Sequence, residues 1–61
     1  MTQFITEQCL VLRNECETYI DSLSYVNDLI EEVLEKYPLE NRATIITRVH
    51  EKLKEVWGID A

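Results

Sequence analysis

The chain has 61 residues, of which 46% are apolar and 30% are charged, with a single glycine and a single proline. This composition is too apolar for a disordered tail and too poor in turn residues for a β fold, so we expect one all-α domain. The formal net charge of −6 excludes the basic surface that binding to nucleic acid or to an anionic membrane requires.

A long heptad repeat dominates the first half of the chain. From Ile5 to Tyr37, apolar residues recur at alternating spacings of four and three residues. A pattern sustained over this length is typical of a coiled-coil helix, so it predicts one long helix over residues 4–37. Ser22 and Ser24 allow an alternative, in which the helix breaks and a new helix is capped there. The heptad register continues across both serines, and we therefore expect a single helix. The heptad residues are Ile5, Cys9, Leu12, Cys16, Tyr19, Leu23, Val26, Ile30, Val33 and Tyr37.

A shorter second helix is expected after Pro38, because a proline disfavours helical backbone at the residue before it. Apolar residues then recur at helical spacing from Leu39 to Val56, and Gly58 follows Trp57 as a residue suited to end a helix. The sequence thus predicts a second helix over residues 39–57. A short connection favours antiparallel neighbours, so residues 1–61 are expected to form a single helical hairpin.

The two expected helices differ in length, which leaves part of the first one uncovered. With ~33 and ~18 residues at ~1.5 Å per residue, the first helix extends about 20 Å beyond the second. The overhang carries Ile5, Cys9, Leu12 and Cys16, and exposing them would cost ~1.5–3 kcal/mol for each large side chain. We therefore expect these residues to form the seam of a homo-oligomer, most simply a dimeric four-helix bundle, or to be covered by a foreign partner. The residues expected to hold the fold are Leu12, Cys16, Leu23, Val26, Ile30, Ile46 and Leu53.

Four further residues are candidates for contact with another protein. Leu10 and Val11 lie outside the heptad seam, and Tyr25 shares a second helical stripe with Val11. Trp57 is either an interface anchor or a lid over the end of a small core. Residues 1–37 hold eight of the twelve acidic residues and two of the six basic ones. One face of this helix is acidic, and it is either solvated or docks on a basic partner surface. Its residues are Asp28, Glu31, Glu32 and Glu35. The predicted function is that of an interaction module, acting as an adaptor, a regulator or an inhibitor.

The residues that could carry catalysis or bind a metal lack the neighbours that such chemistry requires. Cys9 and Cys16 fall two helical turns apart on the seam, and His50, the only histidine, lies on the other helix. The sequence has no zinc-ligand spacing, phosphate-binding glycine loop or nucleophile elbow. We therefore expect no enzyme activity, no cofactor and no metal. The sequence also lacks the pattern of a signal peptide and the ~20 apolar residues of a membrane span, so we expect a cytoplasmic protein, in the host cytoplasm if it is viral.

The end of the chain resembles a family of small helical adaptors. The stretch Val56-Trp57-Gly58-Ile59-Asp60, together with Glu7-Gln8 and Arg13, is similar to the cyanobacterial phycobilisome-degradation adaptors. This resemblance implies a helical dimer that binds another protein. In that family the second helix is the longer one, and Pro38 departs from this pattern.

A second resemblance implies a different function. The stretch from Pro38 to Leu53, with its sequence IITRVHEKL, looks like the helical hairpin of phage proteins that sequester immune signalling nucleotides. It implies an alternative function as a sponge that holds a nucleotide between protomers. The candidate contacts are Arg42, Arg48 and Trp57, which offer two positive charges and a ring for stacking.

Overall fold

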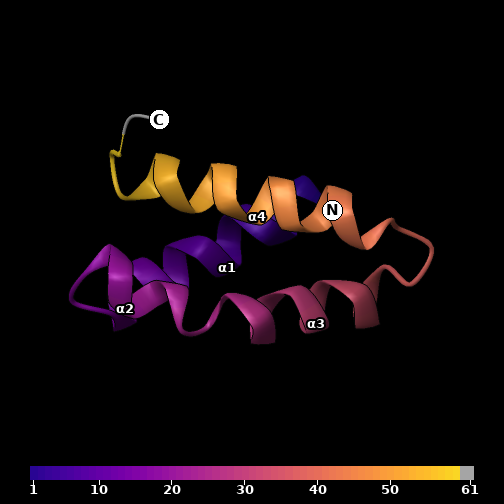
Figure 1. Ribbon diagram of the computed structural model, residues 1–61, viewed down its shortest axis with the longest axis horizontal. Coiled ribbons are helices and arrows are strands. Elements are labelled where there is room, and N and C mark those ends of the chain that lie inside the picture. Colours follow the sequence, from indigo (N-terminus) through magenta and orange to yellow (C-terminus); the bar gives the residue numbers. More distant parts are fainter. Residues whose placement is uncertain (60–61) are drawn as a thin grey trace.

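The computed structural model describes residues 1–59, so that Asp60 and Ala61 lie outside the described part of the chain. Within residues 1–59 the protein is all-α, as predicted, and contains no strand. Its helices are α1 (Thr2–Glu15), α2 (Tyr19–Leu23), α3 (Val26–Lys36) and α4 (Arg42–Val56). The three longer helices pack around one core, and the short α2 joins α1 to α3 (Figure 1).

Of the three longer helices, two run in one direction and the third runs in the opposite direction. Cys9 of α1 contacts Val49 of α4, and Arg13 one turn later contacts Val56, so α1 and α4 run in the same direction. The Phe4 and Tyr37 rings meet edge-on with their centres 6.2 Å apart, which places the start of α1 beside the end of α3. Helix α3 is therefore antiparallel to both of its neighbours (Figure 1).

The expected single helix over residues 4–37 is wrong. The backbone leaves the helical conformation at Cys16 (φ −102°, ψ 147°) and at Thr18 (φ −134°, ψ 161°). The Thr18 side chain then caps the next helix, because its Oγ1 accepts a hydrogen bond of 3.1 Å from the Asp21 amide. A second interruption follows at Ser24 and Tyr25, close to the serines at which the alternative interpretation placed a break. The heptad residues on the two sides of these breaks consequently face one another.

The core is closed within a single chain, and this removes the expected overhang. Ile5 and Cys9, predicted to need a second chain, are both 0% exposed among residues of α3 and α4. Leu12 is partly buried against the same core, and Cys16 is half-buried at the break. The expectation that Ile5, Cys9 and Leu12 lack an intramolecular partner was therefore wrong. The buried apolar residues are Ile5, Cys9, Val26, Leu29, Ile30, Val33, Ile45, Val49 and Leu53.

Two residues predicted to hold the fold lie at its surface. Leu23 is 38% exposed and Ile46 is 36% exposed, whereas the neighbouring Ile45 is fully buried. Leu23 is the last residue of the short α2, and the break before this helix changes the direction of its side chains relative to α1. The heptad assignment could place Leu23 in the core only if the helix had continued.

The ends of α4 follow local rules that the sequence shows clearly. Helix α3 stops at Lys36, before Pro38, as expected, and α4 starts at Arg42, slightly later than expected. The Asn41 side chain caps it, since its Oδ1 accepts a hydrogen bond of 2.8 Å from the Ala43 amide. Gly58 adopts the left-handed conformation (φ 68°) after the helix, as predicted. The amides of Gly58 and Ile59 donate hydrogen bonds to the last turn of α4, which satisfies its free carbonyl groups.

Candidate functional site

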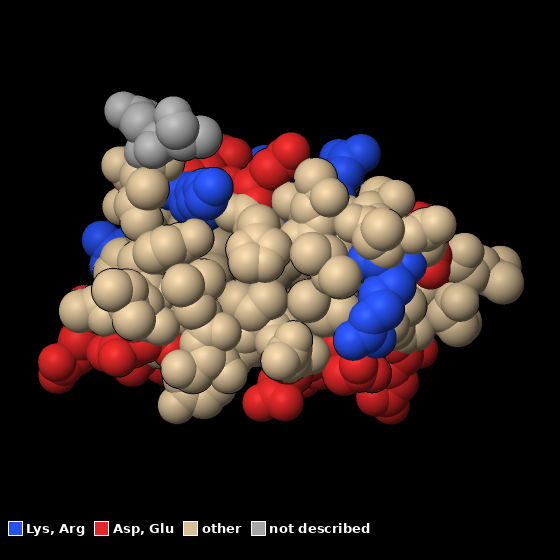
Figure 2. All heavy atoms as spheres, in the orientation of Figure 1, with Lys and Arg blue, Asp and Glu red and all other residues tan. Residues whose placement is uncertain are grey.

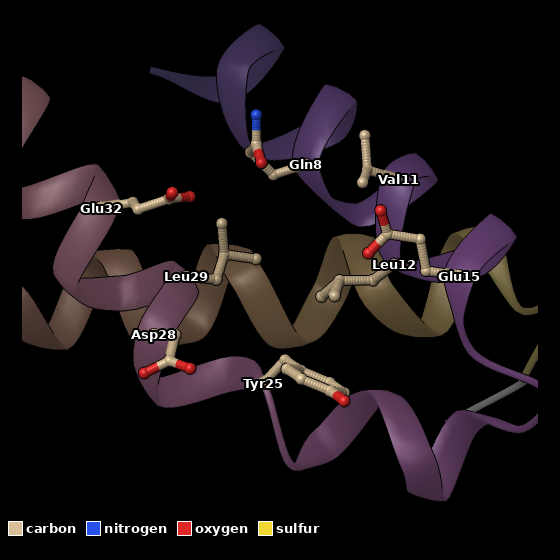
Figure 3. Close-up of a pocket in the computed structure, with 8 residues that line it drawn as sticks. All are labelled: Gln8, Val11, Leu12, Glu15, Tyr25, Asp28, Leu29 and Glu32. Atoms are coloured by element: carbon tan, nitrogen blue, oxygen red, sulfur yellow. The ribbon is translucent and has the colours of Figure 1, made fainter.

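A cleft between α1 and α3 is the candidate functional site. Its floor is formed by Leu12, which is partly buried, and Leu29, which is 4% exposed. Val11 and Tyr25 stand beside this floor, 43% and 51% exposed, on facing elements (Figure 3). The hollow has a volume of about 160 Å³, and an apolar cavity of ~150 Å³ holds one benzene-sized group. Its full lining is Gln8, Val11, Leu12, Glu15, Tyr25, Asp28, Leu29 and Glu32.

The break after α1 creates this cleft. In a continuous helix Val11 and Tyr25 would lie ~21 Å apart along one face, at ~1.5 Å per residue. Because the chain reverses between Cys16 and Val26, the last turns of α1 instead face the first turns of α3. Ser22 supports the reversal: it is fully buried and its Oγ donates a hydrogen bond of 2.6 Å to the Tyr19 carbonyl.

Carboxylates surround the apolar floor. Glu15 of α1 and Asp28 and Glu32 of α3 line the cleft, and within residues 1–59 none of them lies within ion-pair distance of a lysine or arginine. The Arg42 side chain pairs instead with Glu31 at 2.9 Å. In Figure 2 acidic side chains gather along the edge formed by α2 and α3, while the middle of this face carries few charges. The cleft is thus apolar at its base and negatively charged at its rim.

Other basic side chains near α1 are directed to aromatic rings rather than to these carboxylates. The Arg13 guanidinium carbon lies 4.5 Å from the centre of the Trp57 ring, and the Lys36 Nζ lies 4.7 Å from that of Phe4. Arg13 also donates a hydrogen bond of 3.1 Å from its Nε to the Val56 carbonyl. These contacts connect α1 to the ends of α3 and α4, so they leave the negative charge of the cleft uncompensated.

The structure brings together two of the four predicted partner-binding residues. Val11 and Tyr25 line the same cleft, whereas Leu10 and Trp57 are not part of its lining. Leu10 is 47% exposed on α1. Trp57 is half-buried beneath Arg13, and its indole N–H is buried without an acceptor among the described residues. Trp57, at the end of α4, therefore packs against the core and beneath Arg13 of α1.

The residues proposed to hold a nucleotide do not converge within one chain. Arg42 is the first residue of α4 and Trp57 follows its last, which separates them by about 20 Å at ~1.5 Å per residue. Arg48 is exposed in the middle of the helix, and Arg42 is already paired with Glu31. A nucleotide site built from these residues would require a second chain to bring them together.

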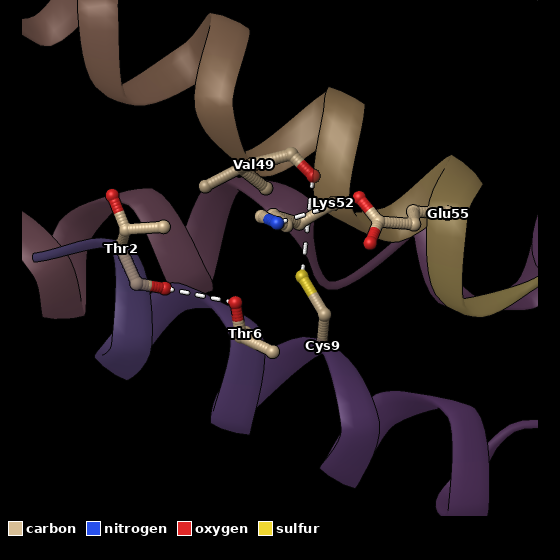
Figure 4. Close-up of polar contacts among 6 residues, drawn as sticks. All are labelled: Thr2, Thr6, Cys9, Val49, Lys52 and Glu55. Atoms are coloured by element: carbon tan, nitrogen blue, oxygen red, sulfur yellow. Dashed lines mark hydrogen bonds and ion pairs between the residues drawn. The ribbon is translucent and has the colours of Figure 1, made fainter.

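The two thiols lie in surroundings that disfavour the thiolate form. Cys9 is fully buried, and its Sγ lies 3.9 Å from the Val49 carbonyl oxygen, to which it donates (Figure 4). Burial raises the pKa of the Cys9 thiol to about 11, although the nearby Lys52 partly lowers it. Loss of solvent contact also raises the pKa of Cys16, and Asp21 and Glu15 add to the shift. Both thiols are thus poor nucleophiles, since the thiolate is the reactive form.

Among residues 1–59 there is no cluster of three or more histidine, cysteine, aspartate or glutamate side chains arranged to hold a metal ion. None of the helices described has both the length and the apolar content needed to cross a bilayer.

Comparison with protein-family models, with curated proteins and with solved structures finds no match to this chain. The cleft and its charges are therefore the basis on which a function can be proposed.

The sequence patterns marked Leu12 as a seam residue and Asp28 and Glu32 as part of an acidic face, but did not mark Leu29, Gln8 or Glu15 as part of a site. Gln8 and Glu15 of α1 lie across the cleft from Tyr25 and Leu29 only because α1 and α3 are antiparallel. A signal for the break was present at Thr18 and Asp21, because a threonine three residues before an acidic residue is typical of a helix start.

Proposed function

We propose that this protein is a non-enzymatic interaction module, an adaptor, regulator or inhibitor, that binds another protein through the cleft between α1 and α3. The observation that carries the proposal is the exposure of Val11 and Tyr25 beside the apolar floor of that cleft. Large apolar side chains grouped on both walls of a cleft are typical of interaction sites. Burying them against a partner would contribute ~25 cal/mol for each Å² of apolar surface.

The absence of catalysis belongs to the same proposal. A nucleophile needs an adjacent base or a lowered pKa, and burial raises the pKa of Cys9 to about 11. His50 is half-buried on α4, whereas Cys16 is at the break after α1. A protein of this kind acts by occupying a surface of its partner.

Self-association is a separate part of the proposal. The buried positions of Ile5 and Cys9 remove the overhang as its cause, but Leu23 and Ile46 leave apolar surface exposed. A second copy of a chain with a net charge of −6 would pair most easily over a face with few charges, such as the middle of the face in Figure 2. Sedimentation velocity in reductant, over a wide range of protein concentration, tests this; a monomer throughout would contradict self-association and leave partner binding unaffected.

Site-specific photocrosslinking tests partner binding. A photoreactive phenylalanine analogue replaces Tyr25 in the cleft, and in a control variant it replaces Leu39, which is 99% exposed in the loop before α4. We expect the Tyr25 variant, expressed in the cells that make the protein, to form a discrete adduct with a protein that the Leu39 variant does not form. Identical adducts at both positions, or none at Tyr25, would contradict the proposal.

A further inference from the structure

The cleft between α1 and α3 continues into a second hollow at the break after α1. The second hollow has a volume of about 240 Å³, and the two share Glu15 and Tyr25 in their linings. The first hollow is mainly apolar, while the second is bordered by the side chains of Glu17, Asp21 and Ser24. A ligand that places an apolar group in the first hollow would therefore meet polar, acidic surface directly beside it.

The negative charge around the two hollows favours a cationic ligand. Their linings hold five carboxylates, and no lysine or arginine of the described chain lies within ion-pair distance of them. The five residues are Glu15, Glu17, Asp21, Asp28 and Glu32. An anionic ligand such as a nucleotide would be repelled here. A second copy of the chain would bring further negative charge.

The spacing of the carboxylates matches a helix. Asp28 and Glu32 lie four residues apart on α3, which places them one turn apart on the same face. A helix lying along α3 can carry a cation one turn before and one turn after one large apolar side chain, all on the face turned to the cleft. Glu15, on the opposite wall, would meet a cation on the other flank of that side chain.

We propose that the cleft binds a basic amphipathic helix of a partner protein. One aromatic or aliphatic side chain of that helix enters between Val11 and Tyr25, and its neighbouring lysines or arginines face Glu15, Asp28 and Glu32. This inference rests on the proposed function, because it specifies the partner of the same cleft. Complementary charge then directs the partner to the cleft and excludes acidic proteins from it.

Binding of a designed peptide tests the inference. The probe is a labelled amphipathic peptide with one phenylalanine, flanked by lysines three and four residues to either side, and fluorescence anisotropy reports its binding to the full chain. Matched peptides replace the lysines by glutamate or the phenylalanine by serine. We expect the basic peptide to bind, both replacements to weaken it, and added salt to weaken it further by screening.

Two charge-matched protein variants show whether the cleft itself is responsible. The first neutralises the carboxylates of the rim, and the second removes as many charges elsewhere, at exposed positions outside the two hollows. The cleft variant carries Glu15→Gln, Asp28→Asn and Glu32→Gln, and the control carries Glu7→Gln, Glu40→Gln and Glu51→Gln. We expect the cleft variant to bind the basic peptide about tenfold more weakly, and the control to change by less than about twofold.

The outcomes separate this inference from the proposed function. Equal losses in the two variants, or equal binding of the basic and acidic peptides, would overturn the basic helix as the partner. A protein adduct at Tyr25 without peptide binding would leave the proposed function standing and refute this partner class. An adduct at Tyr25 with a second copy of the chain would refute it too. Peptide binding without any adduct at Tyr25 would count against the proposed function, because the cleft would then attract basic peptides without having a partner.

Discussion

Substitutions of Ile5 test whether α1 is buried against helices of its own chain or against a second chain. Its side chain is 0% exposed in the core that α1, α3 and α4 form together. Shortening a buried isoleucine to alanine costs about 2–5 kcal/mol, through lost burial and the cavity left behind. A domain of 61 residues has a free energy of unfolding of about 3–9 kcal/mol, at ~0.05–0.15 kcal/mol per residue. We therefore expect Ile5→Ala to lose about half of the stability.

Urea denaturation, followed by far-UV circular dichroism and Trp57 fluorescence, measures this loss. Since Ile5→Ala can leave too little stability to measure, Ile5→Val provides a smaller step of about 0.5–1.5 kcal/mol. Leu10→Ala is the matched control, because Leu10 lies on the same helix but is 47% exposed. Its effect should not exceed about 0.5 kcal/mol. For a domain of this size, 1 kcal/mol corresponds to a change of about 4–8 °C in Tm.

Protein concentration decides between one chain and two. If α1 is buried within its own chain, the difference in stability between Ile5→Val and the wild type is the same at every concentration. If a second chain covers Ile5, this difference changes with concentration, because the dimer contributes to the stability of the folded state. A concentration-dependent difference, or equal effects of Ile5→Ala and Leu10→Ala, would refute the core described above.

Three further predictions concern the pKa of a thiol, a helix cap and the heptad core. The pKa of Cys9 is raised from 9.0 to about 11, so the native state holds the thiol proton more tightly than the unfolded chain. This difference stabilises the native state by at most ~2–3 kcal/mol, an amount that is fully present below pH 9 and is lost as the pH rises through 11. Urea titrations of Cys9→Ala at several pH values should lack this part of the pH dependence. Thr18→Ala removes the acceptor of the Asp21 amide and should cost ~1 kcal/mol in thermal melts; a gain in stability would indicate a continuous helix. Leu23→Asp should retain the helical circular dichroism spectrum because Leu23 is 38% exposed, whereas Leu53→Asp, at a 0% exposed position, should not fold. If Leu23→Asp lost its helical spectrum, Leu23 would have to lie in the core, as an unbroken heptad helix requires.

The heptad pattern predicted the apolar face of the helices and not their length. Val26, Ile30 and Val33 are buried, as a continuous seam requires. The spacing of apolar residues is the same whether the facing helix belongs to another chain or to the same chain folded back, so periodicity alone could not decide between them. The decision rests on local capping at Thr18, where the backbone is extended and the hydroxyl accepts a hydrogen bond from the Asp21 amide, one of the free amides in the first turn of α2.

Two residues of the candidate site, Val11 and Tyr25, were predicted from the sequence, but the reason for selecting them was wrong. Val11 and Tyr25 were selected because they share a stripe on one helix, yet they meet because they lie on opposite sides of a chain reversal. Leu29 was not selected, because it lies beside the heptad seam and nothing in a continuous helix marks it as the floor of a cleft. Composition did indicate an acidic first half, but only the fold gathers that charge around one apolar hollow.

The same reversal implies an electrostatic cost to the free protein. In a continuous helix Glu15 would lie about 20 Å from Asp28 and about 25 Å from Glu32, at ~1.5 Å per residue, distances at which ~0.1 M salt screens most repulsion. In the folded chain these carboxylates line one cleft without a basic partner among the described residues. Like charges that line one cleft repel one another, and a cationic partner would relieve that repulsion.

This cost gives a prediction in which stability and binding change in opposite directions. The variant with Glu15→Gln, Asp28→Asn and Glu32→Gln should be more stable than the wild type at low salt, by ~0.5–1 kcal/mol, while it binds the basic peptide more weakly. Thermal melts at low and high salt measure this gain, which screening should reduce. If the variant were instead less stable at both salt concentrations, the carboxylates would be making stabilising contacts in the free protein, and their unpaired charge could no longer be taken as a sign of a basic partner.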